Sequence, residues 1–136
     1  MIFKMKKHSP QFLALVAIAK KRIYEITPQE LKQKLDRDDS FQLIDVREDH
    51  EWPSGHIPKA VHLSKGIIER DIEKTIPDFQ TPIVVYCSGG FRCALVADTL
   101  QQMGYANVQS LATGSQGWID AGFEVEKDLA SATPQP

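Results

Sequence analysis

An apolar run that ends in a cysteine and a pair of glycines places the tightest constraint on how this chain folds. Residues 83–86 are mostly β-branched, Cys87 follows them, and Gly89 and Gly90 lead into a helix-like segment that starts at Arg92. β-branched residues favour a buried strand, adjacent glycines allow a turn whose amides point inward, and a helix N-terminus attracts negative charge. The pattern therefore predicts a strand, an anion-binding loop and a helix in direct succession.

Cys87 is the candidate nucleophile of this loop. A free thiol is mostly protonated at neutral pH, but a helix N-terminus and a nearby arginine lower its pKa, and the thiolate is the species that attacks. We expect a pocket to open onto its sulfur. The alternative is a buried structural thiol, since cysteine is among the most buried residue types.

The overall composition is that of one ordinary soluble globular domain. The chain has 136 residues, of which 42% are hydrophobic and 25% charged, enough for a core that needs neither metal nor disulfides. A formal net charge of −2 argues against a nucleic-acid binder. The two cysteines form neither a disulfide framework nor a metal-ligand cluster, so we expect no metal, and a reducing compartment, the cytoplasm, fits best.

The N-terminal segment contains an apolar stretch, residues 12–19, between lysines and the basic residues 20–22. Residues 17–19 resemble a cleavage site, but only five apolar residues precede them, fewer than the core of a secretory signal has, and the whole stretch is far too short to span a bilayer. We therefore predict an N-terminal amphipathic helical extension over residues 1–22 that packs on the domain, rather than a signal peptide. The domain itself is predicted over residues 23–126, followed by a flexible tail over residues 127–136.

Strand patterns and helix patterns alternate along the chain. Thr27 and Glu30 form a capping-box pattern with a proline at the first helical position. Alternation of this kind predicts a mostly parallel sheet with helices on both faces and a site at the carboxyl ends of the strands, where Cys87 and Asp45 both fall. Strands are expected over residues 24–26, 41–46, 60–63, 83–86 and 107–111, and helices over residues 11–20, 28–35, 67–76, 92–103 and 116–121.

Four blocks of residues together resemble the rhodanese-like sulfurtransferases in their single-domain form. The resemblance implies an α/β fold, with a rhodanese-like, mostly parallel five-stranded sheet flanked by helices on both faces. It also implies that Cys87 carries a sulfur atom as a persulfide. The blocks follow one another in family order and are residues 44–47, Glu51 with residues 55–60, residues 84–92, and Gly114 with Trp118.

The length of the loop adds to this resemblance. Four residues separate Cys87 from Arg92, whereas phosphatases that use a cysteine have one residue more. A shorter ring of amides suits one sulfur atom better than a tetrahedral phosphate. Loop length therefore favours sulfur transfer over dephosphorylation or arsenate reduction.

We expect a thiosulfate sulfurtransferase of the rhodanese type, which moves sulfane sulfur from thiosulfate or a persulfide donor to a thiol or cyanide acceptor. Transfer is ping-pong through a Cys87 persulfide that inward-pointing amides stabilise, and no cofactor is implied. The alternative is a sulfur-carrier or adaptor module that receives sulfur from a partner protein without turning over small donors. The residues expected to bind substrate are Ser88, Gly89, Gly90, Phe91 and Arg92.

Two arginines have open roles. Arg92 either holds the anionic donor or anchors the loop. Arg47 is a possible substrate contact, because the strand end before it faces the site. A structural role for Arg47 is favoured, with an ion pair to Glu48 or Glu51, while Asp45 fixes the turn.

Cys93 stands where the family more often has a small hydroxyl residue or alanine. One interpretation makes it a resolving thiol that attacks a Cys87 persulfide. The favoured interpretation is a packing residue in the first helical turn whose side chain points away from the loop, since geometry decides which cysteines can pair.

The remaining candidates are expected to be structural. An ionised thiolate needs no general base, so His50, His56 and His62 are assigned to turn structure. Trp118 is expected to complete the core beside a short final helix.

Overall fold

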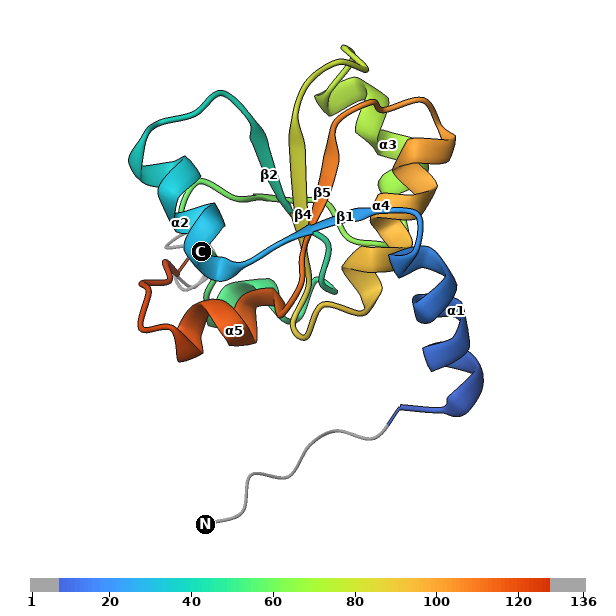
Figure 1. Ribbon diagram of the computed structural model, residues 1–136. Coiled ribbons are helices and arrows are strands. Elements are labelled where there is room, and N and C mark those ends of the chain that lie inside the picture. Colours follow the sequence, from blue (N-terminus) through green and yellow to red (C-terminus); the bar gives the residue numbers. More distant parts are fainter. Residues whose placement is uncertain (1–7, 128–136) are drawn as a thin grey trace, which may run out of the picture.

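The computed structural model describes residues 8–127, in which one five-stranded sheet lies between two layers of helices (Figure 1). The strand order is β1-β5-β4-β2-β3, and every pairing between neighbours is parallel. The predicted α/β fold with a parallel sheet and helices on both faces is confirmed. The strands are β1 (Tyr24–Ile26), β2 (Gln42–Asp45), β3 (Val61–His62), β4 (Ile83–Tyr86) and β5 (Val108–Leu111).

The helices begin and end within one or two residues of the predicted limits. At the start of α2 the predicted capping box is present: the Glu30 amide donates to Thr27 Oγ1 at 3.1 Å, and the Thr27 amide donates to Glu30 Oε1 at 2.9 Å. The helices are α1 (Pro10–Lys20), α2 (Pro28–Asp36), α3 (Ile68–Thr75), α4 (Arg92–Gln102) and α5 (Gly114–Asp120), with a short 3-10 helix η1 (Trp52–Ser54).

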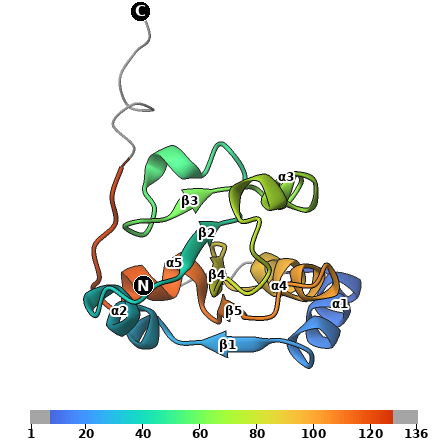
Figure 2. The same ribbon diagram turned by 90° about the horizontal axis from the view of Figure 1, so that it is seen from above.

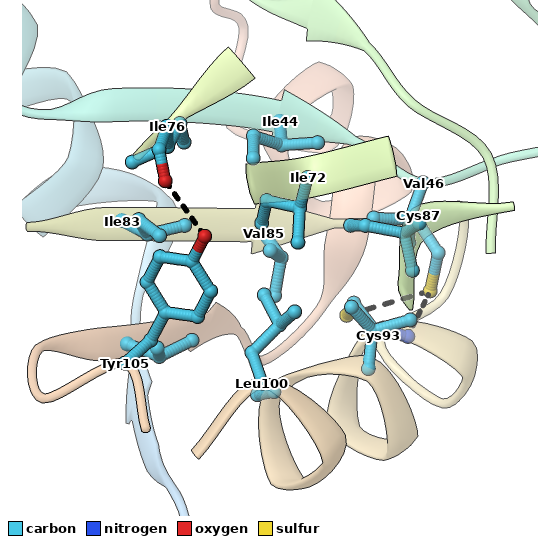
Figure 3. Packing of buried hydrophobic residues seen from close by; sticks show 14 residues of the cluster. Ile44, Val46, Ile72, Ile76, Ile83, Val85, Cys87, Cys93, Leu100 and Tyr105 are labelled. Atoms are coloured by element: carbon cyan, nitrogen blue, oxygen red, sulfur yellow. Dashed lines mark hydrogen bonds between the residues drawn. The ribbon is translucent and has the colours of Figure 1, made fainter. Parts of the chain in front are cut away.

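Each face of the sheet has its own apolar cluster and its own helices (Figure 2). On one face α3 and α4 bring Ile72 and Leu100 against Val85 (Figure 3). On the other face α2 and α5 cover Val84 and its neighbours, and Trp118 is buried there as expected. Side chains alternate between faces along a strand, so residues 84 and 86 point to the α2 and α5 side. Residues 85 and 87 point to the α3 and α4 side.

α1 packs against the outer side of α4 (Figure 1). Val16 and Ala19 are buried there, whereas Leu15 and Ile18 are 59% and 49% exposed, so the outer side of this helix is apolar as well. None of the helices within residues 8–127 combines the length and hydropathy needed to cross a bilayer. The predicted limits of the extension and the domain stay predictions, and most of the predicted tail lies outside the described residues.

Candidate functional site

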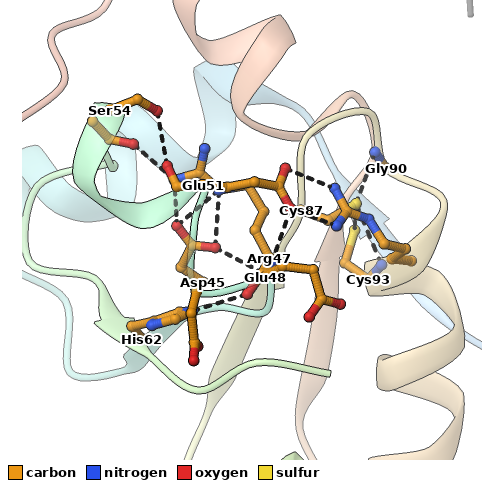
Figure 4. A network of polar contacts seen from close by, with 12 residues as sticks. Asp45, Arg47, Glu48, Glu51, Ser54, His62, Cys87, Gly90 and Cys93 are labelled. Carbon is orange, nitrogen blue, oxygen red and sulfur yellow. Dashed lines mark hydrogen bonds and ion pairs between the residues drawn. The ribbon is translucent and has the colours of Figure 1, made fainter. Parts of the chain in front are cut away.

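The loop after β4 directs main-chain amides at a sulfur atom (Figure 4). The amide of Gly90 donates to Cys87 Sγ at 3.2 Å and that of Cys93 donates to it at 3.4 Å. Gly90 has a φ of 96°, and a Cβ atom there would collide with the carbonyl group of Ala112. A glycine is therefore required at this point both for the backbone conformation and for the close approach of the chain after β5.

The N-terminus of α5 supports the loop from the other side. The amides of Ser115 and Gln116 donate to the carbonyl oxygens of Cys87 and Ser88, at 2.8 and 2.9 Å. Gly114 has a φ of 63°, and a Cβ atom there would collide with the Ser88 carbonyl. These bonds hold the part of the loop that precedes the glycine pair against the first turn of α5.

A second thiol lies beside the first. Cys93 Sγ is 3.5 Å from Cys87 Sγ (Figure 3), and the Ser110 hydroxyl on β5 donates to Cys93 Sγ at 3.1 Å. Both cysteines are free and buried. The expectation that the Cys93 side chain points away from the loop is wrong. Cys93 belongs to the face of α4 that packs on the sheet, together with Val96 and Leu100, and this face meets the end of β4.

The two thiols have opposite pKa shifts. The pKa of Cys87 is lowered, first by its hydrogen bond with the Cys93 side chain, then by the amides of Cys93 and Gly90 and the charge of Arg92, which together outweigh burial. The pKa of Cys93 is raised, chiefly because it is buried and then because of the adjoining Cys87 sulfur. When the pair has lost one proton, Cys87 is therefore the thiolate and Cys93 the thiol.

Arg92 is engaged by a carboxylate from the segment after β2. Its Nη1 and Nη2 atoms donate to Glu51 Oε1 and Oε2 at 2.7 and 3.1 Å (Figure 4). The bond from Arg92 lowers the pKa of Glu51 to about 2, and the Glu48 amide also donates to Glu51. In this conformation Arg92 anchors the loop, which was one of its two expected roles.

Arg47 is paired differently from the prediction. Its Nε and Nη2 atoms donate to the carboxylate of Asp45 at 2.7 to 3.0 Å, and Nη2 also donates to the Gly55 carbonyl at 2.7 Å. The prediction of Glu48 or Glu51 as its partner is wrong. Residues two apart at the end of a strand point the same way, so Asp45 is nearest. Arg47 is only 7% exposed, so this pair is a buried brace of the turn.

Two of the histidines pack against Trp52 in the turn between β2 and β3. The His56 ring stacks on Trp52 with centroids 3.8 Å apart, and the His62 ring lies 5.1 Å from the same indole. His62 Nε2 is also 2.8 Å from the carbonyl oxygen of Arg47. Within residues 8–127 no group of three or more histidine, cysteine or acidic side chains could hold a metal ion.

Cys87 is closed to solvent in this structure. It is 1% exposed, and two cavities of about 170 and 510 Å³ lie elsewhere, lined by residues of α2, α5 and the segments 38–43, 58–59 and 122–124. The expectation of an open pocket onto Cys87 is wrong for this conformation, because the side chain points toward α4 and the first turn of that helix lies over it. The sulfur nevertheless contacts donors and not hydrocarbon alone.

Sequence reasoning missed three parts of this site. Ser110 carried no signal, because it reaches Cys93 from a neighbouring strand. Glu51 was recognised within a family block but not as the partner of Arg92. The α5 amides were missed because the last helix was expected to start at Gln116.

A parallel α/β sheet with a thiolate-stabilising loop after its central strand defines a class of thiol-dependent domains. Within that class, this chain belongs to the rhodanese-like domain family, since the family model for the rhodanese-like domain matches residues 27–121.

Several of the proteins similar to this chain are named for sulfur transfer or sulfur carriage. The chain is 36% identical to "Putative sulfurtransferase YtwF" of Bacillus subtilis, over 71% of this chain and 90% of that protein. It is 32% identical to "Putative sulfur carrier protein YrkF" of the same organism, over 71% of this chain, and it spans about half of that protein's length, 51%. The structure of a polysulfide-sulfur transferase homodimer from Wolinella succinogenes superposes with a TM-score of 0.74 and 27% identity, over 87% of this chain and 88% of that one. Sulfur transfer and sulfur carriage are thus both represented among similar proteins.

Proposed function

We propose that this protein is a sulfurtransferase that moves sulfane sulfur from thiosulfate or a persulfide donor to a thiol or cyanide acceptor through a persulfide on Cys87. The environment of the sulfur supports this most directly. Two amides, at 3.2 and 3.4 Å, and a thiol at 3.5 Å surround Cys87 Sγ. Donors so placed stabilise a negatively charged sulfur, whether thiolate or terminal persulfide.

The reaction has two halves. The Cys87 thiolate attacks the outer sulfur of thiosulfate, sulfite leaves with the bonding electron pair, and Cys87 becomes a persulfide. The acceptor thiol or cyanide then takes the outer sulfur, and the Cys87 thiolate is restored. The residues proposed to enclose the transferred sulfur are those of the loop, Ser88, Gly89, Gly90, Phe91 and Arg92.

Phosphate is a poorer fit to this loop than sulfur. The four loop residues between Cys87 and Arg92 close tightly enough to leave the Cys87 thiol 1% exposed. A phosphoryl group would have to place three oxygens inside the ring, and the guanidinium that would hold them is bonded to both oxygens of Glu51. A single transferred sulfur atom needs less space inside the loop than a phosphoryl group.

A donor has to open the site before it reaches Cys87. Arg92 is the side chain best placed to move, since it is 28% exposed and its partner Glu51 is 23% exposed. An anionic donor such as thiosulfate competes with Glu51 for the guanidinium, so that donor binding releases the anchor of the loop. Arg47 is held in a buried pair and contributes by bracing the turn, not by meeting the donor.

A sulfur-carrier function is the second candidate. The closed position of Cys87 favours it, because a persulfide there is protected from small thiols until a partner protein opens the loop. The similarity to the protein named as a sulfur carrier favours it as well. Under either function the two free thiols suit a reducing compartment, and we place the protein in the cytoplasm.

Mass spectrometry of the reduced protein after incubation with thiosulfate tests the proposal. Trypsin cleaves after Lys74 and Arg92, so the peptide 75–92 contains Cys87 and no other cysteine. We expect one added sulfur on this peptide in Cys93→Ser protein, in which no neighbouring thiol can remove it, and none when Cys87→Ser protein is treated alike. Turnover of thiosulfate, compared with loading by a persulfidated protein donor, separates the enzyme from the carrier. If neither donor adds sulfur to this peptide of the Cys93→Ser protein, both functions are excluded.

A further inference from the structure

We propose that Cys93 is a second catalytic thiol, which discharges the Cys87 persulfide as hydrosulfide and leaves a Cys87–Cys93 disulfide. This inference rests on the proposed persulfide function of Cys87. It assigns to the same site a further activity, the reduction of sulfane sulfur to hydrosulfide, in addition to transfer to an external acceptor.

The geometry that carries the inference is the approach of the two sulfur atoms. They lie 3.5 Å apart, so an adjustment of about 1.5 Å reaches the disulfide bond length of about 2.05 Å. The Cys93 amide also donates to Cys87 Sγ, so main chain and side chain of one residue both face the nucleophile. No other residue within 8–127 brings a second thiol to this loop.

The surroundings of Cys93 suit a reacting thiol. Cys93 is fully buried, and the Ser110 hydroxyl, also fully buried, donates to its sulfur at 3.1 Å. The Cys93 sulfur also donates to the carbonyl oxygen of Leu111 at 3.7 Å, so contacts with Ser110 and Leu111 fix its position beside Cys87. A small hydroxyl side chain at position 93 could donate to Cys87 but could not form a bond to its sulfur, so the thiol adds a capacity that a hydroxyl lacks.

The chemical step balances without a further reactant. Cys93 Sγ attacks the inner sulfur of the persulfide, Cys87 Sγ, and the bond between the inner and outer sulfur atoms breaks. The outer sulfur leaves with the electron pair of that bond. It takes the proton of the Cys93 thiol and departs as hydrosulfide. The sulfane sulfur gains two electrons, and the two cysteine sulfurs lose two as they join. An external dithiol then reduces the disulfide and restores both cysteines.

The test follows sulfur and disulfide in the same sample. Reduced protein is freed of reductant, treated with thiosulfate or inorganic polysulfide without an acceptor thiol, and quenched with an alkylating agent. Trypsin cuts between Arg92 and Cys93, so a disulfide links peptide 75–92 to peptide 93–127 and a persulfide remains on peptide 75–92 alone. We expect the linked peptides together with about one hydrosulfide per chain.

The Cys93→Ser variant is the matched control, because it keeps a hydrogen-bond donor of similar size. It should accumulate the persulfide on peptide 75–92 and lose hydrosulfide release. A wild-type protein that keeps a stable persulfide beside an alkylated Cys93 would overturn the inference and leave the proposed function intact. Absence of added sulfur, of the linked peptides and of hydrosulfide from the wild type would instead remove the proposed function. The wild-type measurement decides alone if the variant fails to fold.

Discussion

The ends of two neighbouring strands, β2 and β4, present buried polar groups that differ in how completely they are paired. After β2, Arg47 is 7% exposed and its guanidinium is bonded to the Asp45 carboxylate and the Gly55 carbonyl. After β4, the two thiols contact each other and otherwise accept only weak hydrogen bonds, from two main-chain amides and the Ser110 hydroxyl. We call these the β2 brace (Asp45 and Arg47) and the β4 loop (residues 87–93).

The comparison shows that burial has different consequences for an ion pair and for a thiol. A buried charge that meets its opposite at 2.7 Å is neutralised and held still, so the β2 brace is a structural element. A buried thiol beside amides and a second thiol is stabilised as the anion without being neutralised, so the sulfur of the β4 loop suits the reaction proposed for it. Glu51 joins the two regions, since it follows β2 and holds Arg92 of the β4 loop.

The largest expected effect is on the β4 loop. Cys87→Ser removes the atom proposed to carry the sulfur, so transfer from thiosulfate to cyanide should fall by about 10³-fold or more. Thermal unfolding should change little, because serine nearly matches cysteine in size. Activity is followed by thiocyanate formation and stability by circular dichroism. A variant that retained transfer would show that the β2 and β4 regions do not differ in reactivity as described.

The β2 brace should show the largest effect on stability. Asp45→Ala leaves the Arg47 charge buried without its partner, which costs about 3 to 5 kcal/mol in the free energy of unfolding. Asp39→Ala is the control, because Asp39 forms a comparable pair with Arg37 on the surface and its loss should be almost neutral. Urea unfolding measures both. Equal effects of the two substitutions would contradict the structural role of the brace.

Glu51→Gln tests the link between the two regions. Loss of the bidentate bond to Arg92 should lower the free energy of unfolding by about 1 to 3 kcal/mol at neutral pH. The pKa of Glu51 is about 2 in the folded protein and about 4.3 in an unfolded chain, so its contribution is complete above pH ~4.3 and is lost as pH falls toward 2.

Urea titrations of the wild type and Glu51→Gln at a series of pH values check this sign. The difference between their free energies of unfolding should be constant from neutral pH to about pH 5 and should decrease steadily below that. A gap that widened on acidification would mean that Glu51 is not held by Arg92 in solution.

The smallest expected effect is at His56, within the turn that carries the β2 brace. His56→Gln removes the stack on Trp52, worth about 1 kcal/mol, and should leave the rate of sulfur transfer unchanged. The measurement pairs a thermal melt with the thiocyanate assay at neutral pH. A large loss of rate with little loss of stability would instead make His56 part of the chemistry.

Local features were the most predictable from sequence. The run 83–86 is buried on both sides as its continuous apolar character indicated, and the capping box at Thr27 formed as its pattern predicted. The partner of Arg47 was predictable in principle, because Asp45 lies two residues earlier and its side chain points to the same side of the strand. The direction of Cys93 was not, because it depends on where α4 sits against β5.

The sequence alone determined that a thiol would sit between a buried strand and a helix N-terminus, since a β-branched run, a glycine pair and a helix-forming segment act over a few residues. Tertiary structure decided what meets that thiol and whether solvent reaches it. Glu51, Ser110 and Ser115 come to the loop from three separate segments. Contacts of that kind depend on the order in which parallel strands lie side by side, and no local pattern encodes that order.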